Sequence, residues 1–76
     1  MGILYSFLSP TEKKVINLLM KGLTNQKIGD ELCLSKGTID AHINSIYSKY
    51  DVENPKRVNL VLKRLKEIEN ENTNTL

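Results

Sequence analysis

The sequence predicts an all-α fold with four helices in a single small domain. Its 76 residues leave room for one core only. Apolar residues recur at steps of three and four positions along most of the chain, which is the period of a helix. Residues that favour helix starts precede these apolar stretches. We expect an N-terminal arm over residues 1–8, the folded domain over residues 9–69 and a disordered polar tail over residues 70–76.

The first helix is predicted over residues 10–21. Ser9 is suited to cap it, Pro10 fits the first helical position, and Glu12 completes an S-x-x-E capping box. Gly22 supplies the stop signal. The helix has a broad apolar face formed by Val15, Ile16, Leu18 and Leu19.

A short second helix follows, capped by Thr24 or Asn25, with Ile28 and Leu32 facing inward. Gly29 in its middle costs about 1 kcal/mol of helix propensity relative to alanine. A helix that contains such a glycine usually needs it for the close approach of another element. We expect that element to be the start of the third helix.

The third helix begins after a turn at Cys33-Leu34, with Ser35 as its cap. One stripe of this helix is apolar and predicted to be buried: Ile39, Ile43, Ile46 and Tyr50. The opposite side carries Gly37, Ala41, Asn44 and Ser48, flanked by Asp40 and Ser45. This outer face is small and polar, whereas a merely solvated helix face more often carries Glu and Lys. The pattern favours a face that docks closely on a partner.

The fourth helix is predicted to start at Asn54-Pro55, which offers a cap and a first helical residue. Its apolar residues form a stripe that is wide enough to pack against both the core and a partner helix. They are Val58, Val61, Leu62, Leu65 and Ile68.

Composition excludes several classes of function. There are 11 Lys and Arg against 9 Asp and Glu, so the formal charge is only +2. One cysteine and one histidine allow neither an internal disulfide nor a metal site. No nucleophile–base pair or Gly-rich phosphate loop is present, so we expect no catalysis, no cofactor and no small-molecule substrate. The chain lacks a membrane span and a basic leader, and we expect a cytoplasmic location.

The chain resembles the helix-turn-helix domain of the LuxR/GerE/NarL-type transcription regulators. The matching motifs are L-S-P-x-E at residues 8–12, G-L-T-N at 22–25, S-K-G-T-I-x-x-H-I at 35–43 and K-Y-D-V at 49–52. The family usually has K-L-G-V at the last of these. The resemblance implies a four-helix domain that binds double-stranded DNA with its third helix in the major groove and often dimerises through its fourth.

The outer face of the third helix is the predicted base-reading surface. Asn44 is suited to a bidentate hydrogen bond with adenine, Ala41 to contact with a thymine methyl group. The outward position of Asn44 favours this contact over an ordinary solvated surface residue, whereas Ala41 could equally be a small helix-forming residue. Asp40 could accept from cytosine or disfavour wrong sites. The full set of predicted base contacts is Gly37, Asp40, Ala41, Asn44 and Ser48.

Predicted phosphate contacts combine lysines with hydroxyl, amide and backbone donors near helix N-termini. They are Thr24, Asn25, Lys27, Lys36, Thr38, Ser45 and Lys49. Over residues 24–49 three lysines are balanced by Asp30, Glu31 and Asp40, so the unit is formally neutral. A single copy should then bind weakly, and a homodimer on a palindromic site would recover affinity.

Two alternatives remain open from the sequence. The chain could be an interaction module that pairs with another regulator through the predicted dimer interface, namely Val58, Val61, Leu62, Leu65 and Ile68. It could also act like region 4 of a sigma factor. The basic residues of the last helix are most simply a solvated face, although they could meet RNA polymerase or flanking phosphates. They are Lys56, Arg57, Lys63, Arg64 and Lys66.

Overall fold

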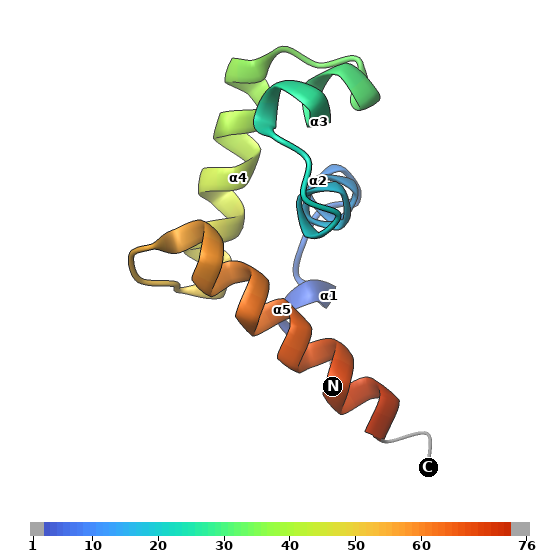
Figure 1. Ribbon diagram of the computed structural model, residues 1–76, viewed down its shortest axis with the longest axis vertical. Coiled ribbons are helices and arrows are strands. Elements are labelled where there is room, and N and C mark those ends of the chain that lie inside the picture. Colours follow the sequence, from blue (N-terminus) through green and yellow to red (C-terminus); the bar gives the residue numbers. More distant parts are fainter. Residues whose placement is uncertain (1–2, 74–76) are drawn as a thin grey trace.

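A computed structural model describes residues 3–73, and within this range every regular element is a helix. The five helices are α1 (Ile3–Ser6), α2 (Pro10–Met20), α3 (Asn25–Leu32), α4 (Lys36–Tyr50) and α5 (Lys56–Thr73). Figure 1 shows α2, α3 and α4 grouped together, with α5 running away from them. The predicted all-α class and its four main helices are confirmed. The one addition is α1, a single turn inside the segment predicted as an arm.

The start of α2 is the capping box that the sequence predicts. The Ser9 side chain accepts a hydrogen bond from the backbone N–H of Glu12, and the Glu12 carboxylate accepts from the backbone N–H of Ser9 at 2.7 Å. Pro10 is the first helical residue. At the other end Gly22 has φ +90°, a conformation that glycine adopts at little cost. The helix ends at Met20, one residue before the predicted end.

The turn between α3 and α4 is compact because Gly29 has no side chain. An ideal Cβ at Gly29 would lie 2.6 Å from the backbone oxygen of Leu34 and 3.5 Å from Cγ1 of Ile39. Thr24 caps α3, and Cys33 ends it in the left-handed conformation with φ 58°. The predicted close approach of the start of the third helix to this glycine is confirmed.

The core lies where α2, α3 and α4 meet, and α4 contributes the whole of its predicted apolar stripe. The fully or almost fully buried apolar residues are Leu8, Val15, Ile16, Leu19, Ile28, Ile39, Ile43, Ile46, Tyr50 and Leu60. Burying one face of α4 leaves its other side turned away from the remaining helices (Figure 1).

Helix α5 corrects three details of the prediction. It begins at Lys56, one residue after Pro55, which the sequence predicted as the first helical residue. Its anchor in the core is Leu60, with no exposed surface, which the sequence prediction left out. Of the predicted apolar set, Val61 is half-buried against the core, whereas Leu62 is 58% exposed. The stripe is therefore split between core and solvent.

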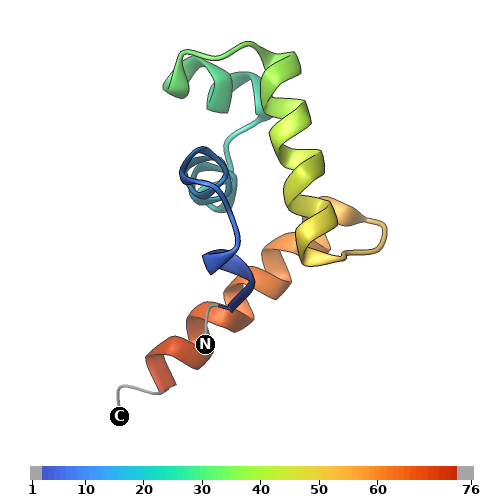
Figure 2. The same cartoon turned by 180° about the vertical axis from the view of Figure 1, so that it is seen from behind.

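The polar tail predicted from residue 70 is also corrected. Helix α5 continues to Thr73, since the sequence offers no Gly or Pro to end it. Residues 74–76 of that tail, and residues 1–2 of the arm, lie outside the described residues. At its other edge α5 holds α1: the backbone N–H of Leu4 donates to Glu67 Oε2 at 3.0 Å. Figure 2 shows α1 against α5 from behind. Within residues 3–73 no helix is both long and apolar enough to cross a membrane.

Candidate nucleic-acid interface

The helix pair α3 and α4, joined by a three-residue turn, presents the outer face of α4 as an open surface (Figure 1). Four of the predicted base-reading residues are exposed there: Gly37, Ala41, Asn44 and Ser48. An ideal Cβ at Gly37 would meet no atom of the described residues within 4 Å. The structure thus brings these four residues together on one side of one helix, as the sequence predicted. A flat or convex partner can approach the backbone of α4 closely along them.

Asp40 does not share this freedom. Its Oδ1 accepts a hydrogen bond from Nδ2 of Asn25 at 2.8 Å, and its Oδ2 accepts from Nζ of Lys36 at 3.1 Å. The Asn25 amide, together with the Lys36 ammonium, lowers the pKa of the Asp40 carboxyl below its usual value. Both carboxylate oxygens have partners within the protein, so Asp40 joins the start of α3 to α4, and its role as a base contact stays a prediction.

Two of the predicted phosphate contacts also have partners within the protein. Ser45 and Lys49 lie on the side of α4 that faces α2. The Ser45 hydroxyl donates to Oε2 of Glu12 at 2.6 Å, and Lys49 Nζ donates to Oε1 of the same carboxylate at 2.6 Å. Because both groups bind a buried carboxylate, they hold α4 on α2, and phosphate contacts by Ser45 and Lys49 stay predictions.

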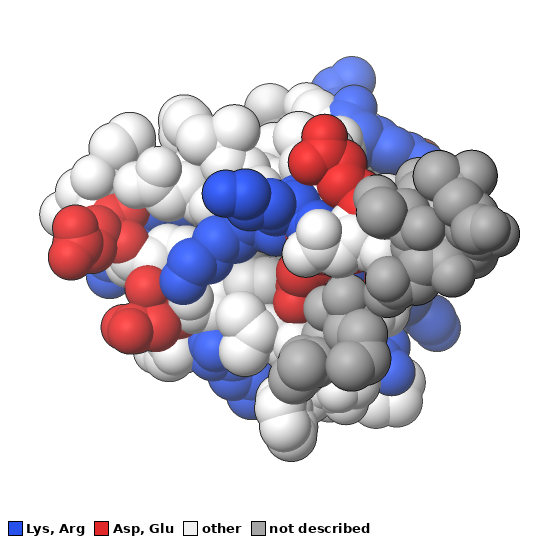
Figure 3. All heavy atoms as spheres, turned by 90° about the horizontal axis from the view of Figure 1, so that it is seen from below, with Lys and Arg blue, Asp and Glu red and all other residues white. Residues whose placement is uncertain are grey.

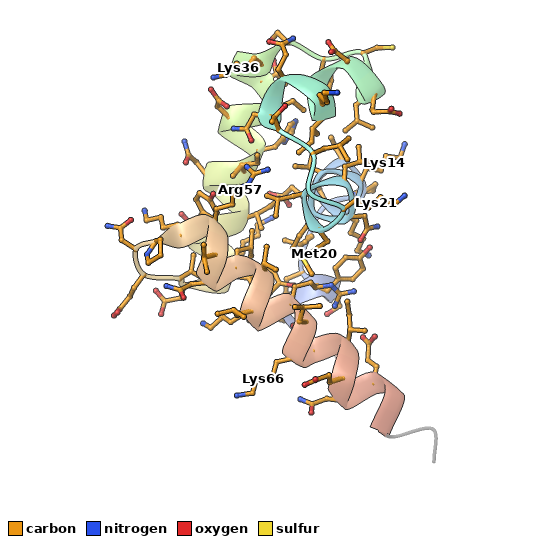
Figure 4. All side chains as sticks on the ribbon, in the orientation of Figure 1. Lys14, Met20, Lys21, Lys36, Arg57 and Lys66 are labelled. Carbon is orange, nitrogen blue, oxygen red and sulfur yellow. The ribbon has the colours of Figure 1, made fainter. Side chains whose placement is uncertain are left out.

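The remaining phosphate candidates surround the N-terminal ends of α3 and α4. The hydroxyl of Thr24 accepts from the backbone N–H of Lys27, and the hydroxyls of Ser35 and Thr38 lie 2.9 Å apart at the start of α4. The first N–H groups of a helix have no partner within the helix, and here those of Lys27 and Thr38 donate to the cap hydroxyls of Thr24 and Ser35. Lys27 is exposed, and the Lys36 side chain is exposed although it pairs with Asp40. Figure 4 shows Lys36 at the end of α4 next to α3.

Arg57 is a contact of this region that the sequence prediction missed. Its Nη1 donates to Oδ1 of Asn25 at 2.7 Å, and its Nη2 donates to the backbone oxygen of Leu23. The amide oxygen and the amide nitrogen of Asn25 therefore each have a partner within the protein. Figure 4 labels Arg57 at the first turn of α5. The missed signal was the position of Arg57 three residues before Leu60, which places it on the core side of the helix.

Arg64 likewise contradicts the interpretation of the last helix's basic residues as a solvated face. It is only 7% exposed, pairs with Glu67 at 3.1 Å and lies over the Tyr5 ring at 3.9 Å from the ring centre. The charges visible at the α5 end of the molecule are mixed in sign: Figure 3 shows Lys and Arg interspersed with Asp and Glu. Among the described residues, no group of three or more His, Cys, Asp and Glu side chains converges as a metal site would.

The fold and this open face define the chain as a helix-turn-helix domain. Residues 6–63 match the protein family described as "Bacterial regulatory proteins, luxR family", and the chain belongs to that family. No solved structure matches the chain significantly.

Curated relatives carry related names. The chain is 39% identical over 54 residues to "Putative HTH-type transcriptional regulator Rv0890c" of Mycobacterium tuberculosis, covering 71% of this chain and 6% of that protein. It is 33% identical over 55 residues to "Putative HTH-type transcriptional regulator YhjB" of Escherichia coli, covering 72% and 28%. It is 40% identical over 45 residues to "Transcriptional regulatory protein LiaR" of Bacillus subtilis, covering 59% and 21%. The chain thus spans less than a third of each of these relatives.

Proposed function

We propose that this chain binds double-stranded DNA with sequence specificity, as a bacterial transcription regulator or the DNA-binding part of one, with no catalytic role. The observation that carries the proposal is the outer face of α4. It is formed by small and polar residues, it is exposed, and it belongs to the second helix of a helix-turn-helix. A major groove admits such a helix, and small residues allow the close approach that hydrogen bonding to base edges requires.

Base reading is assigned to Asn44, with Gly37, Ala41 and Ser48 beside it. An Asn amide matches the N6 and N7 edge of adenine, and such a bidentate pair contributes about 1–3 kcal/mol of discrimination. The Ala41 methyl fits contact with a thymine methyl group. Phosphate binding is assigned to Lys27 and Lys36, to the hydroxyls of Thr24 and Thr38, and to the N-terminal backbone of α3 and α4, including the N–H of Asn25.

A homodimer through α5 completes the proposal. Val58, Leu62 and Leu65 are 54%, 58% and 46% exposed and follow one another at steps of four and three, so they form one apolar stripe along the helix. We call these three residues the α5 stripe. The half-buried Val61 and Ile68 stand beside it. Pairing two copies doubles the phosphate contacts of a unit that is formally neutral, and two-fold symmetry fits a palindromic site.

Selection from random-sequence duplex DNA at two salt concentrations tests this function. We expect enrichment of a palindromic motif and a loss of affinity for it of about tenfold in Asn44→Ala, in line with one lost base pair contact. Asn70→Ala is the matched control, because Asn70 is an exposed asparagine near the far end of α5. The absence of an enriched motif, or equal losses in both variants, would contradict sequence-specific binding through α4.

An interaction module is the second candidate, and the α5 stripe is the observation that favours it. In that case the stripe binds another regulator or RNA polymerase, and DNA affinity is low. Exposed Lys66 lies near the stripe and could add a contact to an acidic partner. Weak binding that is equal for all DNA sequences would move the assignment to this function. The sigma-factor alternative gains no support from the family match.

A further inference from the structure

A continuous set of hydrogen bonds joins the helix that carries the α5 stripe to the helix that carries the proposed base-reading face. The Arg57 guanidinium on α5 donates to Oδ1 of Asn25 and to the backbone oxygen of Leu23. Nδ2 of Asn25, at the start of α3, donates to Oδ1 of Asp40. Oδ2 of Asp40 accepts from Lys36 on α4. We call Arg57, Asn25, Asp40 and Lys36 the α5–α4 relay.

The relay is satisfied in only one orientation of its central amide. Arg57 can only donate and the Asp40 carboxylate can only accept, so the oxygen of Asn25 must face the arginine and its NH2 group the aspartate. A flipped amide would set donor against donor and acceptor against acceptor. The fork of N–H groups on the guanidinium adds a second fixed point at Leu23, which fixes its plane. Each group in the relay therefore restricts the position of the next.

Both ends of the relay adjoin surfaces that the proposed function uses. Arg57 immediately precedes Val58, the first residue of the α5 stripe. Lys36 immediately precedes Gly37, and Asp40 immediately precedes Ala41; Gly37 and Ala41 belong to the base-reading face.

The other contacts between α5 and α4 include Leu60 in the core and two hydrogen bonds at the C-terminal end of α4. Tyr50 Oη donates to Glu67 Oε1 at 2.6 Å, and Lys63 Nζ donates to the backbone oxygen of Tyr50 at 2.7 Å. These hydrogen bonds hold the last turn of α4, whereas the relay is a polar connection from α5 to the first turns of α4. Charge-assisted hydrogen bonds are more directional than apolar contacts, so the relay restricts the angle of those first turns.

We propose that Arg57 is a positioning residue for DNA recognition: through Asn25 and Asp40 it holds the N-terminal half of α4 at the angle that lets its outer face match a specific base sequence when two copies pair through α5. The inference rests on the proposed DNA-binding function. It assigns Arg57 and Asp40 roles in selectivity although neither needs to touch a base. Arg57 connects pairing to base reading, since it belongs to the helix that pairs.

A direct phosphate contact by Arg57 is the competing role, and the two roles differ in what they do to DNA binding. A phosphate contact contributes equally to all sequences and to the salt dependence of binding. A positioning residue contributes to affinity only for the sequences whose bases fit the base-reading face. The distinguishing quantity is the ratio of affinities for the selected site and for random duplex, followed over a range of salt concentrations.

The experiment compares the wild-type chain with Arg57→Gln and, as the control for one lost positive charge, Lys14→Gln. Lys14 is exposed on α2 and points away from α4 in Figure 4. We expect Arg57→Gln to lose about tenfold in affinity for the selected site. Its affinity for random duplex and its salt dependence should match those of Lys14→Gln. The proposal would be overturned if Arg57→Gln lost equal affinity for both DNAs and if the slope of log affinity against log salt concentration fell, relative to Lys14→Gln, by about the value of one phosphate contact.

A second variant breaks the relay without touching α5 and guards against a folding defect in the first. Asp40→Ala removes both acceptor oxygens of the side chain. It also removes a negative charge, so its direct electrostatic effect is to strengthen binding to every DNA. We expect the ratio of specific to random affinity to fall nonetheless. Adding Arg57→Gln to Asp40→Ala should lower that ratio no further, because the relay is already broken. A ratio that stays at the wild-type value in Asp40→Ala, or additive losses in the double variant, would contradict the relay.

Amide NMR spectra of the free proteins make the relay testable apart from DNA. In Arg57→Gln we expect shifts at the Asn25 side-chain NH2 and at the backbone N–H of Asp40, with no comparable shifts in Lys14→Gln. Unchanged signals at Asp40 would overturn the link between α5 and α4. Failure of the wild-type chain to select any motif would instead defeat the proposed function, while the spectra still decide the relay.

Discussion

Lys49 Nζ lies 2.6 Å from Oε1 of Glu12, and this ion pair joins α4 to α2 across the edge of the core. The Glu12 residue is only 4% exposed. Its carboxylate also accepts from the Ser45 hydroxyl and from the backbone N–H of Ser9. One acidic side chain thus completes the cap of α2 and fixes the C-terminal half of α4, whereas the α5–α4 relay fixes the N-terminal half.

Glu12→Gln should lower the free energy of unfolding by about 1–3 kcal/mol, because a neutral amide replaces the charged partner of Lys49 and places an NH2 group among donors. Hydration offsets part of the lost interaction with Lys49, because the side chain of Lys49 is 38% exposed. Urea unfolding at neutral pH measures the change. Glu31→Gln, an exposed position on α3, is the control and should stay within about 0.5 kcal/mol of the wild type.

Acid should weaken the fold through the same carboxylate. Burial raises the pKa of Glu12, but hydrogen bonds from Lys49, Ser45 and Ser9 outweigh it and lower the pKa from 4.5 to about 2. A group whose pKa is depressed in the folded state stabilises fully above its unfolded pKa, and that contribution is lost as pH falls from 4.5 toward 2. The wild type should therefore lose more stability across this window than Glu12→Gln. Parallel pH profiles of the two proteins would contradict the assignment.

Alanine substitutions at two glycines, Gly29 in α3 and Gly37 in α4, should have different effects on stability. Gly29→Ala should destabilise by about 1–3 kcal/mol, because its Cβ would overlap the backbone oxygen of Leu34, and this exceeds the helix-propensity gain of about 1 kcal/mol. Gly37→Ala meets open space among the described residues and should leave stability equal or slightly higher. On the proposed function its added methyl group stands between α4 and the groove, so affinity for DNA should fall. Thermal unfolding of both variants measures the effect on packing, and DNA titration measures the effect on DNA binding.

The sequence predicted most accurately where local chemistry decides structure. The capping box at Ser9 and Glu12 depends on residues three positions apart, and the buried stripe from Ile39 to Tyr50 follows a strict helical period. The close approach at Gly29 was also predicted correctly, because a glycine in the centre of a helix lowers its stability unless another element needs the space. These features need no knowledge of which helix packs on which.

The sequence did not reveal the partners of polar residues that border two surfaces. A helical period places Ser45 and Lys49 at the edge of the outer face of α4, but it does not say that Glu12 of α2 lies beside them. Similarly, Arg64 counts as a surface residue until Glu67 and the Tyr5 ring are seen to surround it. Both cases depend on contacts between distant parts of the chain, which hydrophobic periodicity does not encode.

Leu60 and Leu62, two residues apart on α5, should respond oppositely to substitution. Leu60 has no exposed surface, so Leu60→Ala removes core contacts and should cost about 2–5 kcal/mol of stability. Leu62 is 58% exposed, so Leu62→Glu should leave the unfolding midpoint of the monomer close to that of the wild type. It places a charge in the α5 stripe, and like charges would face each other across a two-fold axis. Sedimentation of Leu62→Glu should show a monomer at concentrations where the wild type pairs, and binding to a palindromic site should weaken while binding to a half-site persists. A wild-type chain that stays monomeric at high concentration, both free and on DNA, would rule out pairing through this stripe.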